Sequence, residues 1–119
     1  MVRTVHDRIQ FINYEGKRIL LVDFSDCPAN EVEEIAREVP EYVTVNPPAS
    51  VLVLTDFTGA AFDRDALLAM KETAVFDKPF VKKSALLGIE DLSFSRREPL
   101  TFKTGEQALA WLVADSVDA

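Results

Sequence analysis

The order of hydrophobic and polar positions along the chain predicts strands and helices that alternate. The clearest element is the segment 51–54, which is apolar at every position (Val51, Leu52, Val53, Leu54). A strand of this composition is buried on both faces, as the central strands of parallel sheets are. Four further strands are predicted from shorter apolar or alternating segments: 8–14, 17–24, 84–89 and 100–103. The first two of these flank Glu15-Gly16, so they are expected to form a hairpin.

Three helices follow from apolar residues at helical spacing. The first is expected to begin after an N-cap at Asn30 and to be kinked or restarted at Pro40. The second is expected to be capped by Asp63 or Asp65, and the third by Thr104. The predicted order is ββαβαββα, in which crossover helices join parallel strands in right-handed units. The sequence thus predicts one α/β domain of 119 residues, with a mixed five-stranded sheet, an N-terminal hairpin and three to four helices.

Polar residues follow the buried strand where the second helix is about to begin. They are Asp56, Thr58 and Gly59. Open α/β sheets bind their ligands at the carboxyl ends of the strands. Asp56 is therefore a candidate to bind a ligand, a metal or a partner, although a carboxylate here also accepts hydrogen bonds within the turn, which is the favoured interpretation. Gly59 is expected to serve the backbone, because one glycine does not make a phosphate-binding loop.

Composition and charge narrow the function classes. The chain has 13 basic and 20 acidic residues and a net charge of −7, which argues against nucleic-acid binding. Cys27 is the only cysteine, which excludes an internal disulfide and fits a reducing compartment. No segment approaches the roughly 18–20 apolar residues of a membrane span. The first residues lack the apolar core of a signal peptide, so a cytoplasmic location is expected.

No catalytic or metal-binding constellation is expected. A catalytic cysteine needs a neighbouring base, and the single histidine, His6, lies near the amino terminus, far from Cys27 in sequence. Asp23, Asp26 and Asp56 end two strands, as acidic residues do in phosphoacceptor receiver domains. The short separation of the two strands leaves no room for the further βα unit of that fold. We therefore expect a protein that is not an enzyme and has no metal and no cofactor.

Four segments carry a resemblance to a known group of proteins: KRILLVDFS (17–25), VLVLTDFTG (51–59), KPFVKKSALLG (78–88) and ALAWL (108–112). They resemble the SpoIIAA-like superfamily, which includes STAS domains (anti-sigma factor antagonists) and CRAL-TRIO lipid-transfer domains, and above all its small bacterial members. The resemblance covers most of the chain and implies a SpoIIAA-like fold. Its segments are strand ends, helix starts and core residues, so it bears on fold more than on activity.

Two departures from that pattern bear on function. STAS antagonists carry a phosphorylatable serine, usually after an aspartate, at the start of the helix that follows the third strand. Asp63 matches the aspartate here, but Arg64 stands at the serine position. The usual phosphoserine switch is therefore not expected. The second departure is a short polar loop between Gly88 and Phe102, where relatives often insert a helix.

The resemblance favours a regulatory or binding module that acts by protein–protein contact. Its partner-binding or ligand-binding residues would be Asp56, Thr58, Gly59, Asp63 and Arg64, with Lys71 further along the helix. Self-association into a homodimer, through a sheet edge or a helix face, is a further expectation.

The alternative function is a carrier or sensor of a small apolar or lipid-like ligand. Its motivation is a group of phenylalanines around the second helix: Phe57, Phe62, Phe76 and Phe80. These side chains either line an apolar pocket beside the sheet or pack in the core, which is the favoured interpretation.

Overall fold

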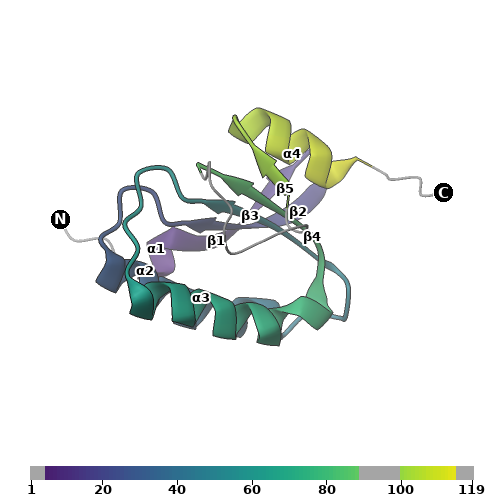
Figure 1. Cartoon of the computed structure of the whole chain (residues 1–119). Helices are drawn as coiled ribbons and strands as arrows, with labels where there is room; N and C mark the ends of the chain where they lie inside the picture. The colour runs from purple at the N-terminus through teal and green to yellow at the C-terminus, as the bar shows by residue number, and fades with distance from the viewer. Residues whose placement is uncertain (1–4, 89–99, 115–119) are drawn as a thin grey trace.

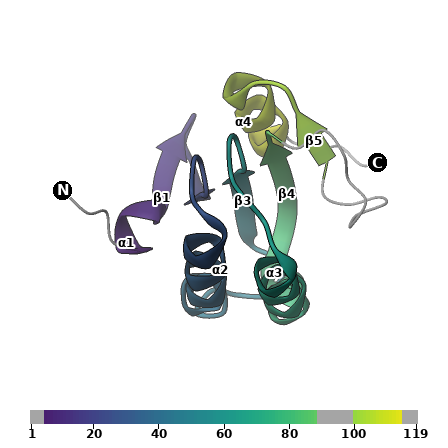
Figure 2. The ribbon, with the colours of Figure 1, turned by 60° about the vertical axis from the view of Figure 1, so that its left-hand side comes forward.

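The computed structural model describes residues 5–88 and 100–114, which form a sheet with helices on both faces. Helices α2 and α3 lie side by side on one face, and α4 covers part of the other (Figures 1 and 2). The elements are α1 (Val5–Arg8), β1 (Ile9–Tyr14), β2 (Lys17–Asp23), α2 (Ala29–Val43), β3 (Val51–Asp56), α3 (Arg64–Asp77), the 3₁₀ helix η1 (Lys78–Phe80), β4 (Val81–Leu87), β5 (Leu100–Phe102) and α4 (Gly105–Val113).

The sheet confirms the predicted mixed, five-stranded arrangement. Its strands follow one another in the order β1-β2-β3-β4-β5. The β1–β2 pair is antiparallel and the other three pairs are parallel. The hairpin turn has positive φ at both central residues, 51° at Glu15 and 83° at Gly16. Two positive φ angles are the mark of a type I′ turn, whose twist matches that of the strands.

The first long helix differs from the prediction at its start and at its proline. Helix α2 begins at Ala29, and its N-cap is Pro28 rather than Asn30, which lies inside the helix. The amides of Glu31 and Val32 both donate to the Pro28 carbonyl, so the backbone itself closes the first turn. The helix also continues through Pro40 to Val43 and is not restarted there.

The other two caps agree with the prediction. The Asp63 carboxylate accepts a hydrogen bond from the Ala66 amide at 2.8 Å at the start of α3. The Thr104 hydroxyl accepts one from the Gln107 amide at 3.1 Å at the start of α4. Each side chain satisfies an amide that has no partner within its helix, and each cap fixes where the helix starts.

The core has two layers because β3 is buried on both faces, as predicted. Val51 and Val53 point to the layer under α2 and α3, and Leu52 and Leu54 point to the layer under α4. The first layer includes Leu20, Val32, Ile35, Val43 and Ala66; the second includes Ile19, Ala85, Ala108 and Leu112. The sheet is therefore held between two apolar layers of unequal size.

A β-bulge at the start of β4 decides which way its lysines point. Val81 lies opposite Val51, and Lys83 lies opposite Leu52, so Lys82 is an extra residue without a partner in β3. The bulge turns Lys83 towards α4. Its Nζ donates to the carbonyls of Trp111 at 2.9 Å and Ala114 at 3.0 Å. The ammonium group thereby satisfies carbonyls at the carboxyl end of α4, where positive charge is favourable.

Replacing this ammonium group should weaken the α4 layer. We expect Lys83→Met to lower the free energy of unfolding by about 1–2 kcal/mol, because charge-assisted hydrogen bonds are lost while the alkyl stem is kept. Lys82→Met, at the exposed bulge position, is the matched control and should stay within about 0.5 kcal/mol. Urea unfolding of both variants measures the difference. Equal free energies of unfolding for the two variants would show that the hydrogen bonds of Lys83 contribute nothing to stability.

Candidate functional site

The loops at the carboxyl edge of the sheet are tied to one another by backbone hydrogen bonds. The Asp26 amide donates to the Thr58 carbonyl at 2.9 Å, and the Ala61 amide donates to the Cys27 carbonyl at 2.9 Å. The Phe57 amide donates to the Leu87 carbonyl at 2.8 Å. Segments that leave β2, β3 and β4 therefore form one surface, and the predicted residues 56–64 run along it.

Two neighbouring strands end in the same tripeptide pattern, Asp-Phe-Ser at 23–25 and Asp-Phe-Thr at 56–58. Asp23 and Asp56 are register partners. Each carboxylate accepts a hydrogen bond from the amide two residues on, at 2.9 Å in both cases. These are Asx turns, so the carboxylate of Asp56 is engaged by its own loop. The repeat was visible in the sequence, but its significance depends on the register of the two strands.

The repeated phenylalanines stack on each other beneath this surface. The rings of Phe24 and Phe57 are 5.0 Å apart and nearly parallel, and Phe62 lies 5.4 Å from Phe57. Phe57 is only 3% exposed. Phe57 is therefore a core residue, and Phe62 packs against the same core layer.

The structure does not bring the four predicted phenylalanines together. Phe62 precedes α3, whereas Phe76 and Phe80 lie at its far end. A helix of this length separates its ends by about 20 Å. Phe80 packs against the core layer and Phe76 is 67% exposed. Phe57, Phe62 and Phe80 thus pack in the core layer at opposite ends of α3, and Phe76 is the one member of the four that is exposed.

Gly59 has a backbone role. Its φ is +72°, and a Cβ there would collide with the Asp26 carboxylate. Gly88, for which the sequence predicted no backbone role, has a φ of +82° and leaves no room for a Cβ beside the backbone of Thr58. Asp26 itself has a positive φ of 56°. The surface therefore depends on contacts between residues distant in sequence, which the sequence alone did not reveal.

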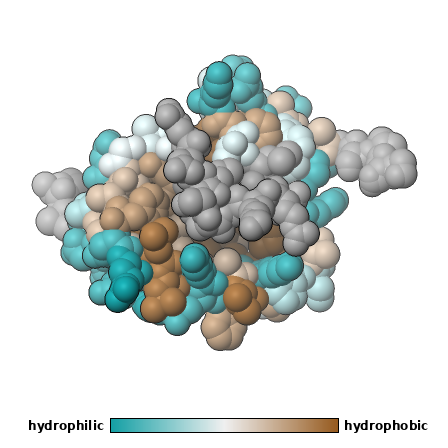
Figure 3. Space-filling model, viewed as in Figure 1, coloured by the Kyte–Doolittle hydropathy of each residue, from teal (hydrophilic) through white to brown (hydrophobic). Residues whose placement is uncertain are grey.

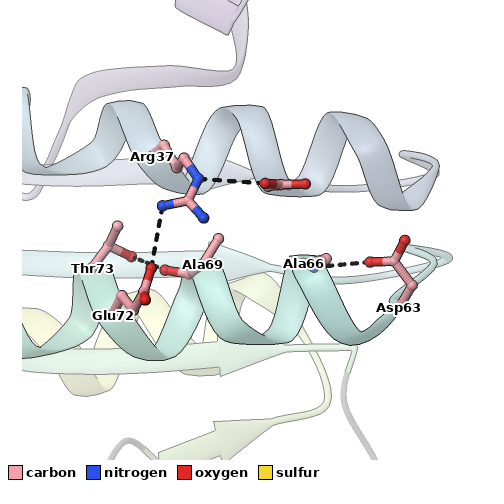
Figure 4. A network of polar contacts seen from close by, with 7 residues as sticks. Arg37, Asp63, Ala66, Ala69, Glu72 and Thr73 are labelled. Carbon is pink, nitrogen blue, oxygen red and sulfur yellow. Dashed lines mark hydrogen bonds and ion pairs between the residues drawn. The ribbon is translucent and has the colours of Figure 1, made fainter.

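The remaining predicted residues differ in what they leave available for binding. Asp63 caps α3 with one carboxylate oxygen, as Figure 4 shows. Thr58, Gly59 and Arg64 are exposed. The segment therefore presents a threonine, a glycine and a guanidinium group to solvent, held in place by carboxylates that bind the backbone.

The acidic residues of this edge do not gather as a metal site. Arg8 contacts Asp23, with its Nη1 3.6 Å from the carboxylate, and donates to the Ser25 carbonyl at 2.9 Å. Across the described ranges 5–88 and 100–114, no group of three or more His, Cys, Asp or Glu side chains is placed to hold a metal ion.

The cysteine lies inside the fold beside this surface. Cys27 is 1% exposed, and burial raises the pKa of its thiol above the ordinary value. The thiolate, which is the nucleophilic form, is thereby disfavoured. The side chain of His6 lies outside the described residues.

A hollow of about 630 Å³ lies at the opposite edge, where the parallel strands begin. Its lining includes Phe11, Arg18, Asn46 and Leu112, and no carboxylate among the described residues. Arg18 stacks over the Phe11 ring at 4.0 Å and donates to the Asn46 side chain at 2.9 Å. This hollow is separate from the predicted phenylalanine group, because none of its four members lines it.

No helix within 5–88 or 100–114 combines the length and apolar character needed to cross a membrane. No family model, curated protein or solved structure matches the chain.

Proposed function

We propose that this chain is a STAS-like binding module that acts by protein–protein contact, without the usual phosphoserine switch. The resemblance of its strand ends and helix starts to SpoIIAA-like proteins supports the module type. The strand order, with a hairpin followed by parallel strands and two crossover helices on one face, is compatible with that fold. Arg64 at the serine position supports a contact that phosphorylation does not control.

One observation carries the proposal: α3 holds large apolar side chains in solvent. Leu68 is 49% exposed, Val75 is 74% exposed, and Phe76 is also on the surface. In Figure 3, apolar side chains reach the surface along the lower part of the molecule, where Figure 1 shows α3. Apolar side chains that gather on a surface mark places where proteins bind one another. The exposed Thr58, Gly59 and Arg64 lie at the start of the same helix.

The alternative, a carrier of an apolar ligand, has less support. Phe57 is stacked on Phe24 within the core, and Phe76 points into solvent. Neither arrangement offers a lined cavity for an acyl chain.

Reversing the charge of Arg64 tests the proposal. Arg64→Glu should leave the thermal unfolding midpoint within about 2 °C, because the side chain is exposed. It should weaken capture of a natural partner at least tenfold, because a charge within the contact changes sign. Gentle purification from the native cells, followed by native mass spectrometry, identifies the partner and measures its loss.

Lys103→Glu is the matched control for that experiment. It makes the same charge change at an exposed residue between β5 and α4, outside both α3 and the predicted residues 56–64. The control should retain the partner. Retention of the partner by Arg64→Glu as well would remove this surface from the proposal.

A further inference from the structure

Helix α3 has a second apolar side, which faces away from the sheet. Six residues of α3 and its C-cap, Lys78, recur at the spacing of one helix face: Arg64, Leu67, Leu68, Lys71, Ala74, Val75 and Lys78. We call these seven the outer face of α3. The buried residues of the helix, Ala66 and Ala69, lie on the other side. A surface helix needs one apolar side to pack on its own core, so the second is available for something else.

The outer face is open along its length. Arg64, Lys71, Ala74 and Lys78 are exposed, as are Leu68 and Val75, and Leu67 is half-buried. Leu68 and Val75 are seven residues apart, which places them two turns, or about 10 Å, from each other. Apolar residues at this spacing are the ones that an amphipathic helix contacts when it packs along another helix.

The outer face carries positive charge only. Three of its seven residues are basic, and none is acidic, in a chain whose net charge is −7. The carboxylate of Glu72 is directed to α2, where it lies 3.3 Å from Arg37 Nη1 (Figure 4). Asp63 is the N-cap, and Asp65 lies off this face. Asp65 and Glu72 therefore border the outer face without being part of it, and the Glu72 carboxylate is turned from it towards Arg37.

We infer that the outer face of α3 binds an acidic amphipathic helix of a partner protein. Leu68 and Val75 supply the apolar contact, and Arg64, Lys71 and Lys78 meet carboxylates that flank the apolar residues of the partner. A second copy of this chain fits less well, because pairing two outer faces brings like charges together. The inference rests on the proposed function and specifies the chemistry of its partner.

A designed peptide tests this chemistry without the natural partner. The probe is a fluorescent peptide of roughly 20 residues, long enough to span α3, with leucine at heptad positions and glutamate at the flanking ones. Its pair has lysine in place of glutamate. In fluorescence anisotropy, we expect the full chain to bind the acidic peptide and not the basic one. The affinity for the acidic peptide should fall as the salt concentration is raised.

Two variants locate the contact. Lys71→Glu and Leu68→Ser should each weaken binding of the acidic peptide at least tenfold, whereas Lys103→Glu should not. All three positions are exposed, so the fold should be kept, and circular dichroism verifies this.

Three results would overturn the inference. They are equal binding of both peptides, unchanged binding by Lys71→Glu, and a homodimer in sedimentation that Leu68→Ser converts to monomer. None of them removes the binding-module proposal, which depends on a natural partner that is lost in Arg64→Glu. Conversely, a natural partner that survives Arg64→Glu contradicts that proposal, whatever the peptide does.

Discussion

Gly88→Ala should destabilise the fold by about 3 kcal/mol or more. Part of this loss arises because φ at Gly88 is +82°, a conformation that costs an L-residue about 1–2 kcal/mol. The rest arises from a collision, because the new Cβ would lie 2.5 Å from the Thr58 amide nitrogen and 2.7 Å from its Cα. The backbone of Thr58 cannot move freely, since its amide is bound to the Asp56 carboxylate and its carbonyl to the Asp26 amide.

Gly16→Ala separates the two contributions. Its φ is +83°, almost identical, but no atom lies within 4 Å of the position of a Cβ. This variant should therefore show only the backbone penalty of about 1–2 kcal/mol. Urea unfolding of both variants gives the comparison. If both variants lost the same free energy of unfolding, the close contact between Gly88 and Thr58 would make no contribution to the cost of Gly88→Ala.

Asp77→Asn should stabilise the protein at neutral pH. Asp77 ends α3, where the helix dipole disfavours negative charge. Its Oδ1 is buried, with no hydrogen-bond partner among the described residues. Burial raises the pKa of this carboxyl from 3.8 to about 6. Burial in the folded state disfavours the ionised carboxylate of Asp77. The neutral amide of asparagine should therefore raise the free energy of unfolding at pH 7 by about 1–2 kcal/mol, allowing for partial contact with solvent.

The pH dependence of this gain follows from the raised pKa. The folded state takes up the Asp77 proton near pH 6 and the unfolded state only near pH 3.8, so this group makes the wild type more stable as pH falls between those values. The asparagine variant lacks that contribution. Its advantage should thus be largest at pH 7 and above, shrink through pH 6 and vanish by about pH 4.

Asp65→Asn is the control for the titration. Asp65 is an exposed residue in the first turn of the same helix, where negative charge is favourable. Its substitution should lower stability slightly and should not reproduce the pH-dependent gain. Thermal unfolding at several pH values measures all three proteins. A constant difference between wild type and Asp77→Asn across that range would contradict the raised pKa.

The sequence predicted those elements whose signals are local. The apolar segment 51–54 predicted a strand buried on both faces. Thr104 predicted the start of α4, and Asp63 was one of the two caps predicted for α3, because a cap depends on atoms three residues away. The start of α2 was wrong because the Pro28 carbonyl closes the first turn without a side-chain cap. The predicted strand 84–89 began too late, because β4 already starts at Val81, and the bulge at Lys82 was missed because it exists only relative to β3.

The candidate site was predicted as a segment but not as a surface. Residues 56–64 lie at the carboxyl edge of the sheet, yet Asp26 and Gly88, which shape the same edge, come from loops distant in sequence. The phenylalanines show the opposite error, because nearness in sequence did not predict nearness in space when a whole helix intervened. The outer face of α3 was overlooked because two apolar sides on one helix obscure the periodicity of each.

The order of the strands bears on how the protein assembles during synthesis. Each strand from β2 to β5 pairs with the one made just before it, so the sheet can grow at one edge as the chain leaves the ribosome. Helix α4 is the last described element to emerge, and it covers Leu52, Leu54 and Ala85. Until then this apolar face is open to water, and the nascent chain is most prone to aggregate or to engage a chaperone in that interval.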